Sequence, residues 1–406
     1  MYFKKQNTMA PISVRNPLST AASIALTTTA AILICTSQRS LHAQDAASNR
    51  SNEPELPAAH QATLLRPFWI GNRMSNEPIL FLKEPDLPYA TARLLFAPTR
   101  LLSLSSVNGA IEYVEGRDYT WKRGSNLLTL TKDSRIPFKT VAEMHPPVGA
   151  PNTLGKTKDG KSSLFFIGNG PEFQNIQPLA TYEHKQKWAG HIPPSGQSEL
   201  GRTIARLSAK RPVKIVVFGD SISTGASASS MFNEFPYQPG YPDIVADGLR
   251  FHYGASISVT NLSEGGQDSR WATSQVAKVV AAKPDLVIIG FGMNDASRRF
   301  TGEEYAKNIQ TVISEIQVAL PGTDFILVAT MVGNPDWDQT VPELYSQYRE
   351  VLTRMKKPGI AVADLTTVWQ EMLHIKKFDD ITANGLNHPN DFGQRTYAHV
   401  ILQLMQ

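Results

Sequence analysis

The chain has 406 residues, of which 41% are hydrophobic and 19% are charged. This length and composition are typical of a globular protein with two ordinary domains, and they exclude disorder on a large scale. The formal net charge of +4 arises in residues 1–43, which carry Lys4, Lys5, Arg15 and Arg39 and no acid. Because the rest of the chain is neutral, we expect neither nucleic acid nor an anionic membrane surface as a partner.

Residues 1–43 have the pattern of a secretory signal peptide. A basic start is followed by the apolar run 21–35, and Ala43 offers a small residue for cleavage. An uncleaved membrane anchor is the alternative, because the apolar run is near the length that spans a bilayer. A lipid-modified Cys35 is disfavoured by the bulky Ile34 before it. We expect an exported protein, periplasmic or secreted, without stable membrane insertion after cleavage and without disulfides, since Cys35 is the only cysteine.

The segment 44–60 is polar and unpatterned, which predicts a disordered N-terminus. Residues 61–181 contain short apolar or alternating runs separated by turn signals, which is typical of an antiparallel β domain of the sandwich type. The expected strands are Ile79–Leu82, Ala92–Phe96, Leu101–Ser105, Ile111–Val114, Tyr119–Trp121 and Leu127–Thr131. Residues 182–212, with paired prolines, are predicted to form a linker and a lead-in helix.

From residue 213 to 406 strand and helix patterns alternate, which predicts a parallel sheet covered by helices on both faces. The expected strands are 214–218, 257–261, 286–290, 325–331 and 360–364, and the expected helices are 241–252, 274–282, 301–320 and 341–356. Thr301 and Glu304 form a capping box at the start of the clearest helix.

The first of these strands ends abruptly at Gly219, and Ser221 follows at the rim of the sheet. Ligands bind at the carboxyl ends of strands in open α/β sheets, so Ser221 is a candidate nucleophile. The alternative is a serine that only caps the next helix.

Three later stretches place complementary groups at the same rim. Gly265 and Gly266 follow the second strand and permit a free backbone N–H. Asn294 follows the third strand and offers a side-chain amide, while His388 lies in a loop just before the last helix. Each signal is weak alone, because glycine pairs and asparagines commonly just form turns.

These four stretches, in this order, resemble the SGNH or GDSL hydrolase superfamily over about residues 210–406. The resemblance implies an α/β, flavodoxin-like three-layer sandwich with a five-stranded parallel sheet. It implies that Ser221 is the nucleophile and His388 the base. The N–H groups of Ser221 and Gly266 and the side chain of Asn294 would form the oxyanion hole. The α/β-hydrolase elbow does not fit, because its second glycine is replaced by Ser223.

One departure from the superfamily concerns the acid that orients the histidine. The usual Asp, three residues before the histidine, is replaced by Gly385. Asn384 could accept from the imidazole N–H, although it offers no charge. Asp391 carries a charge but suits a helix cap better. We therefore expect a Ser221–His388 dyad whose imidazole is oriented by Asn384 or by a backbone carbonyl.

The resemblance implies a serine esterase that works through an acyl-serine, with no metal and no organic cofactor, and the signal-peptide pattern implies that it is exported. We favour an acylated carbohydrate substrate, with O-deacetylation of a polysaccharide as the reaction. The alternatives are a lipase, lysophospholipase or thioesterase acting on another small ester, and a carbohydrate-binding protein without turnover, which the missing Asp would explain. Trp271 could stack on a sugar or pack beneath its loop.

Overall fold

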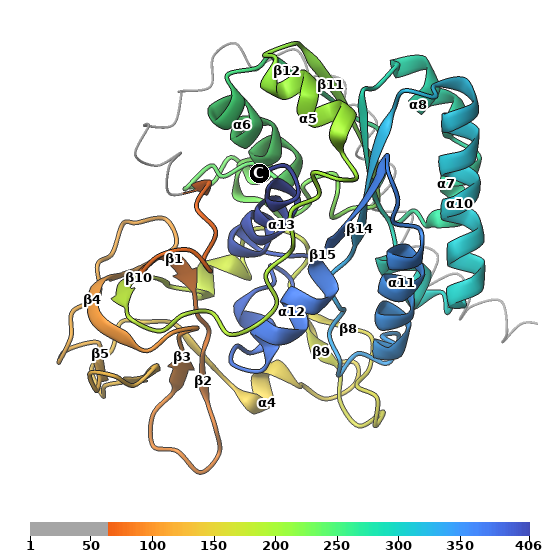
Figure 1. The fold of residues 1–406 in the computed structure, drawn as a ribbon. Coiled ribbons are helices and arrows are strands. Elements are labelled where there is room, and N and C mark those ends of the chain that lie inside the picture. The colour runs from red at the N-terminus through yellow and green to blue at the C-terminus, as the bar shows by residue number, and fades with distance from the viewer. Residues whose placement is uncertain (1–63) are drawn as a thin grey trace, which may run out of the picture. The chain divides into compact units, whose positions relative to one another are not determined.

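The computed structural model describes residues 64–406, which lie within one compact unit from Leu56 to Gln406. Figure 1 shows this part of the chain in colour. The expected signal peptide, 1–43, and the expected disordered segment, 44–60, lie outside the described residues. Among the helices from residue 64 onward, none has the length and apolar character needed to cross a membrane.

The C-terminal half contains the predicted five-stranded parallel sheet. Its strands lie in the order β12 (Ile257–Asn261), β11 (Val213–Gly219), β13 (Leu286–Gly290), β14 (Asp324–Ala329) and β15 (Ile360–Asp364). All four pairings are parallel. This 2-1-3-4-5 order is that of flavodoxin-like folds, and the strand order reverses at β11. The predicted fold class is confirmed, and the end of β11 is the expected place for a ligand.

Helices cover both faces of this sheet. They are α5 (Gly201–Ser208), α6 (Tyr241–Tyr253), α7 (Ser269–Thr273), α8 (Val276–Ala282), α9 (Met293–Ser297), α10 (Gly302–Ala319), α11 (Pro342–Arg354), α12 (Leu365–Leu373) and α13 (Asp391–Gln403). Helix α6 packs on α13, whereas α10 packs on α7, α8 and α11 on the other side of the sheet (Figure 1). The predicted capping box of Thr301 and Glu304 begins α10.

A strand-rich region precedes the parallel sheet, as the sequence predicts. One sheet has the order β1 (Arg73–Pro78), β10 (Leu179–His184), β4 (Pro98–Ser105), and it is antiparallel. The other has the order β5 (Tyr119–Trp121), β6 (Leu127–Leu130), β3 (Thr91–Arg93), β2 (Phe81–Lys83), β7 (Phe138–Thr140), with a parallel β2–β7 pair. The short helix α4 (Val141–Met144) and the pair β8 (Thr153–Leu154) and β9 (Leu164–Phe165) complete the region.

Two local expectations for this region are wrong. The stretch Ile111–Val114 forms no strand and contributes only an isolated bridge between Glu112 and Ser105. The expected linker from residue 182 begins with strand, because Tyr182 to His184 are the last residues of β10. The polar side chains of β10 suggested a surface segment, but its partners β1 and β4 make it the central strand of its sheet.

A buried ion cluster joins the strand-rich region to the C-terminal half. Lys376 Nζ lies 2.7 Å from Glu77 Oε1 and 3.5 Å from Asp380 Oδ2. Tyr182 donates to Glu77 Oε2 at 2.6 Å, and the Leu80 N–H donates to Asp380 Oδ1 at 2.7 Å. The two regions therefore share polar contacts as well as one continuous apolar core.

Candidate active site

Strand β11 delivers Ser221 to the carboxyl edge of the sheet. Gly219, its last residue, lies opposite Gly290 of β13. A Cβ on Gly219 would collide with the Gly290 carbonyl oxygen, so glycine is required for the chain to turn there. Ser221 follows on this turn, and its carbonyl accepts from the Ala226 N–H at 3.1 Å. The close approach of the β11 and β13 backbones thus fixes the position of Ser221.

The structure brings His388 to this serine. Its Nε2 lies 3.0 Å from Ser221 Oγ, across 167 residues of sequence. Both side chains are largely buried, with 8% and 7% of their surface exposed. This is hydrogen-bonding distance for a base and the hydroxyl that it deprotonates.

Asn384 supports the His388 loop in a different way from the one expected. Its Oδ1 accepts backbone N–H bonds from Leu386, Asn387 and His388 at 3.0, 3.0 and 3.1 Å. Its Nδ2 donates to Asn387 Oδ1 at 3.1 Å. The Asn384 amide thus shapes the loop backbone that carries the imidazole.

Asp391 also has another contact. Its Oδ1 accepts the Ser229 N–H at 2.9 Å, and burial raises the pKa of Asp391 to about 6. Helix α13 is capped by Asn390, whose Oδ1 accepts the Gly393 N–H at 3.1 Å. Asp391 thus ties the segment after Ser227 to the start of α13.

The second imidazole nitrogen contacts a residue that sequence reasoning missed. His388 Nδ1 lies 3.3 Å from Ser227 Oγ. Ser227 is 1% exposed and has a φ of +65°, a left-handed conformation that is uncommon for serine. In the sequence, Ser227 is distinguished only by its position six residues after Ser221. The contact of its hydroxyl with His388 becomes apparent only in the folded chain.

The expected oxyanion donors lie on loops that follow three neighbouring strands, β11, β12 and β13, and the Glu264 N–H donates to the Gly219 carbonyl at 3.0 Å. Gly266 has a φ of +79°, and within residues 64–406 neither its N–H nor that of Ser221 donates to another group of the protein. Asn294 Nδ2 donates to the Gln267 carbonyl at 2.9 Å, which holds its amide beside this turn. Arg298 donates to the Gly266 carbonyl at 2.8 Å and fixes the adjoining peptide.

Two buried carboxyls lie beneath the site. Asp220 is 1% exposed, and its Oδ1 accepts the Ile222 N–H at 3.0 Å. Burial raises the pKa of Asp220 to about 7, and the charge of Asp295 adds to this. Asp295 accepts the Ser269 N–H at 3.0 Å, and burial raises the pKa of Asp295 to about 6. Desolvation outweighs the hydrogen bonds in both cases.

Trp271 packs on the core. Its ring lies 5.8 Å from that of Phe218 and 6.3 Å from that of Phe291, measured between centroids. The side chain is half-buried. Of the two interpretations of Trp271, packing beneath the loop is the one that these contacts support.

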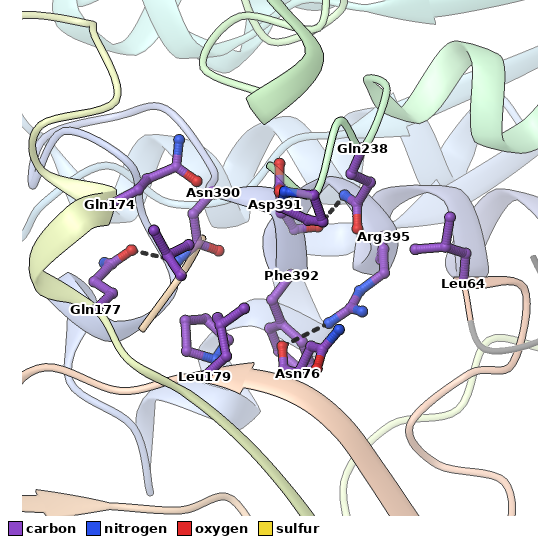
Figure 2. Close-up of a pocket in the computed structure, with 13 residues that line it drawn as sticks. Leu64, Asn76, Gln174, Gln177, Leu179, Gln238, Asn390, Asp391, Phe392 and Arg395 are labelled. Carbon is purple, nitrogen blue, oxygen red and sulfur yellow. Dashed lines mark hydrogen bonds between the residues drawn. The ribbon is translucent and has the colours of Figure 1, made fainter. Parts of the chain in front are cut away.

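The strand-rich region contacts the segments on either side of the His388 loop. Gln174 and Gln177 line the same pocket as Asn390 and Asp391, and Figure 2 shows Asn390 beside Gln177. Asn390 Nδ2 donates to Gln177 Oε1 at 3.2 Å, and Gln177 Nε2 donates to the Thr382 carbonyl at 2.8 Å. In the described part of the chain, no three His, Cys, Asp or Glu side chains group so that they could hold a metal ion.

Residues 217–396 match the model of the GDSL-like lipase/acylhydrolase family. This part of the chain belongs to that family. An arylesterase from Vibrio mimicus is 30% identical over 105 residues, which are 26% of this chain and 48% of the arylesterase. The chain thus spans about half the length of this curated relative.

Solved structures also resemble the GDSL-like domain. A two-domain esterase active on acetylated mannans, co-crystallised with mannopentaose, is 20% identical with a TM-score of 0.42, over 53% of this chain and 55% of that one. A lipase/acylhydrolase from Enterococcus faecalis is 26% identical with a TM-score of 0.37, over 47% and 93% of the two chains.

The packing around Gly385 disfavours an acid at the position where the family usually has one. Gly385, three residues before His388, has a φ of +67°. A Cβ there would lie 3.2 Å from both the Phe173 ring and Asp379 Oδ1. Phe173 comes from the strand-rich region and is fully buried. The packing of that region against the loop therefore explains why glycine stands at position 385.

Proposed function

We propose that the protein is a serine esterase that works through an acyl-Ser221 intermediate. The observation that carries this proposal is the 3.0 Å contact between Ser221 Oγ and His388 Nε2, at the sheet edge where Gly266 and Asn294 also lie. The family match and the arylesterase relative support the same chemistry.

In the first half-reaction His388 Nε2 takes the Ser221 proton while Oγ attacks the ester carbonyl carbon. The resulting oxyanion accepts hydrogen bonds from the N–H groups of Ser221 and Gly266 and from the Asn294 amide. His388 then gives its proton to the alkoxy oxygen, the alcohol leaves, and the acyl group remains on Ser221.

In the second half-reaction water replaces the alcohol. His388 accepts a proton from water as the hydroxide oxygen attacks the acyl-serine, and the same donors hold the second oxyanion. Collapse returns the proton to Ser221 Oγ and releases the carboxylic acid.

Replacing Ser221 tests the reaction. With a small activated acetyl ester we expect Ser221→Ala to lower kcat at least about 1,000-fold, with an unchanged unfolding temperature. Ser314→Ala, which removes an exposed hydroxyl on α10, is the matched control. Turnover retained in Ser221→Ala would exclude the acyl-serine mechanism.

For the substrate we favour an O-acetylated polysaccharide. Phe235 and Tyr237 lie on the segment between Ser227 and α6, and they are 45% and 51% exposed. Their rings meet edge to face, with 6.3 Å between centroids. Exposed flat rings of this kind pack well on sugar rings, which have an apolar face and a polar edge. The strand-rich region and the expected export of the chain agree with a polymer outside the cell.

Acetate release from acetylated xylan, mannan or pectin, compared with hydrolysis of long-chain acyl esters, tests the substrate class. We expect Tyr237→Ala to raise KM for the polysaccharide and to leave KM for a small activated ester unchanged. Preference for long-chain esters would favour a lipase or thioesterase instead. Mass spectrometry of the exported protein tests export, with Gln44 expected as the first residue.

A further inference from the structure

The contact at His388 Nδ1 bears on which of the two imidazole nitrogens carries the proton. For Nε2 to accept the Ser221 proton, a neutral imidazole must hold its own proton on Nδ1. Ser227 Oγ, 3.3 Å from Nδ1, must then act as the acceptor. A hydroxyl can donate or accept, so the role of Ser227 Oγ toward Nδ1 depends on the other group that it contacts.

That group comes from the strand-rich region. Ser227 Oγ lies 3.5 Å from the backbone carbonyl of Asn169, and a carbonyl can only accept. The hydroxyl hydrogen of Ser227 is therefore directed to Asn169, which leaves an oxygen lone pair for Nδ1–H. Gln174 Nε2 donates to the Ser227 carbonyl at 2.8 Å and holds the left-handed backbone in place.

We infer that Ser227 is the positioning residue for His388, in the role that the family's acid usually has, and that the strand-rich region completes this arrangement through Asn169. The inference rests on the proposed esterase function for its catalytic consequence. It assigns to the strand-rich region a part in catalysis that is separate from substrate binding.

A second contact of Asn169 agrees with this role. Its side-chain Oδ1 accepts from Asn384 Nδ2 at 3.0 Å. Asn384 in turn holds three backbone N–H groups of the His388 loop. One residue of the strand-rich region thus contacts both the hydroxyl that faces the imidazole and the amide that shapes its loop.

The test compares three variants of the full chain with a small activated ester. We expect Ser227→Ala to lower kcat about 10- to 100-fold at unchanged KM, and to move the acidic limb of the kcat/KM profile to lower pH, because the imidazolium loses an acceptor. Ser227→Asp restores an acceptor and tolerates the left-handed backbone, so it should recover most of kcat and move that limb to higher pH.

Ser229→Ala is the matched control. Ser229 lies two residues from Ser227 and is also buried, and its hydroxyl accepts the Gln238 N–H at 2.8 Å. We expect it to keep kcat and the pH profile. Equal losses in Ser227→Ala and Ser229→Ala, with no recovery in Ser227→Asp, would reduce Ser227 to a structural residue and overturn the inference.

Nitrogen NMR of His388 separates this inference from the esterase function. We expect the proton on Nδ1 in the unchanged protein and a larger share on Nε2 in Ser227→Ala, whether or not any ester is hydrolysed. An unchanged tautomer in Ser227→Ala overturns the inference. A protein with the expected tautomers that hydrolyses no ester contradicts the proposed function alone.

Discussion

Gly385 shows why the family's acid cannot simply be restored in this chain. We predict that Gly385→Asp lowers the free energy of unfolding by about 1–3 kcal/mol and lowers kcat. The new side chain would crowd the buried Phe173 ring and Asp379 Oδ1, and it would replace the residue type that adopts a φ of +67° most readily. Urea unfolding and ester hydrolysis measure the two effects.

Gly116→Asp separates backbone strain from crowding. Gly116 has a φ of +83°, and a Cβ there would meet nothing within 4 Å. We expect Gly116→Asp to lose less stability than Gly385→Asp and to retain kcat. A Gly385→Asp variant with increased kcat would show that the loop accommodates an acid after all.

The turn that follows β12 is held by one arginine. Arg298 donates to the Gly266 carbonyl and lies 2.5 Å from Asp268, whose side chain caps α7. We predict that Arg298→Leu lowers kcat about 10-fold at unchanged KM, because a less ordered Gly266 peptide weakens one oxyanion donor. Steady-state kinetics with a small activated ester measures this.

Arg270→Leu is the control for Arg298→Leu. It also removes an exposed arginine and an ion pair, to Glu304 at 3.8 Å, but it keeps Arg298, which donates to the Gly266 carbonyl. If both variants lowered kcat equally, a general change of surface charge would explain the loss.

Local patterns were enough to predict the parallel sheet and the rim that carries Ser221. Strands β11, β13 and β15 are largely apolar runs, and β12 starts with an alternating apolar and polar pattern, so these four strands begin and end within a residue of the predicted limits. Strand β10 was missed because three of its six residues are polar and its partners lie far away in sequence, as with Thr181 and Asn76 at a separation of 105 residues.

Within the site too, local patterns predict single residues but not the contacts between residues that are distant in sequence. Ser221, Gly266, Asn294 and His388 each lie in a recognisable local motif, and the structure brings Ser221 and His388 together. Ser227 has no such motif, and its contact with His388 spans 161 residues. The role of Asn384 also depends on Asn169, which comes from a different region of the chain.

At the scale of the whole molecule, Lys376 links its two halves. We predict that Lys376→Ala lowers the free energy of unfolding by about 3–5 kcal/mol, because Glu77 and Asp380 would remain buried without their cation. Lys377→Ala is the matched control. Its ion pair with Glu84 is exposed and should contribute at most about 1 kcal/mol. Urea unfolding that showed equal losses would contradict a joining role for the cluster.

The buried Asp220 should make the folded molecule more stable at lower pH. Its folded-state pKa of about 7 lies above the ordinary value of 3.8. Between these two values the unfolded chain loses the proton and the native protein keeps it, which destabilises the native state progressively as pH rises. The penalty is complete above pH 7 and is relieved as pH falls through that value.

We therefore predict that the free energy of unfolding rises by roughly 1 kcal/mol through Asp220 between about pH 8 and pH 6.5. The window ends there because burial lowers the pKa of His399 to about 3, so that below pH 6.5 the unfolded chain gains a proton that native His399 refuses. Urea unfolding at both pH values should show a smaller pH response and greater stability at pH 8 in Asp220→Asn. Asp133→Asn, on the surface, should respond as the unchanged protein does. An identical pH response in Asp220→Asn would mean that this carboxyl does not titrate between pH 6.5 and pH 8, and it would contradict the prediction.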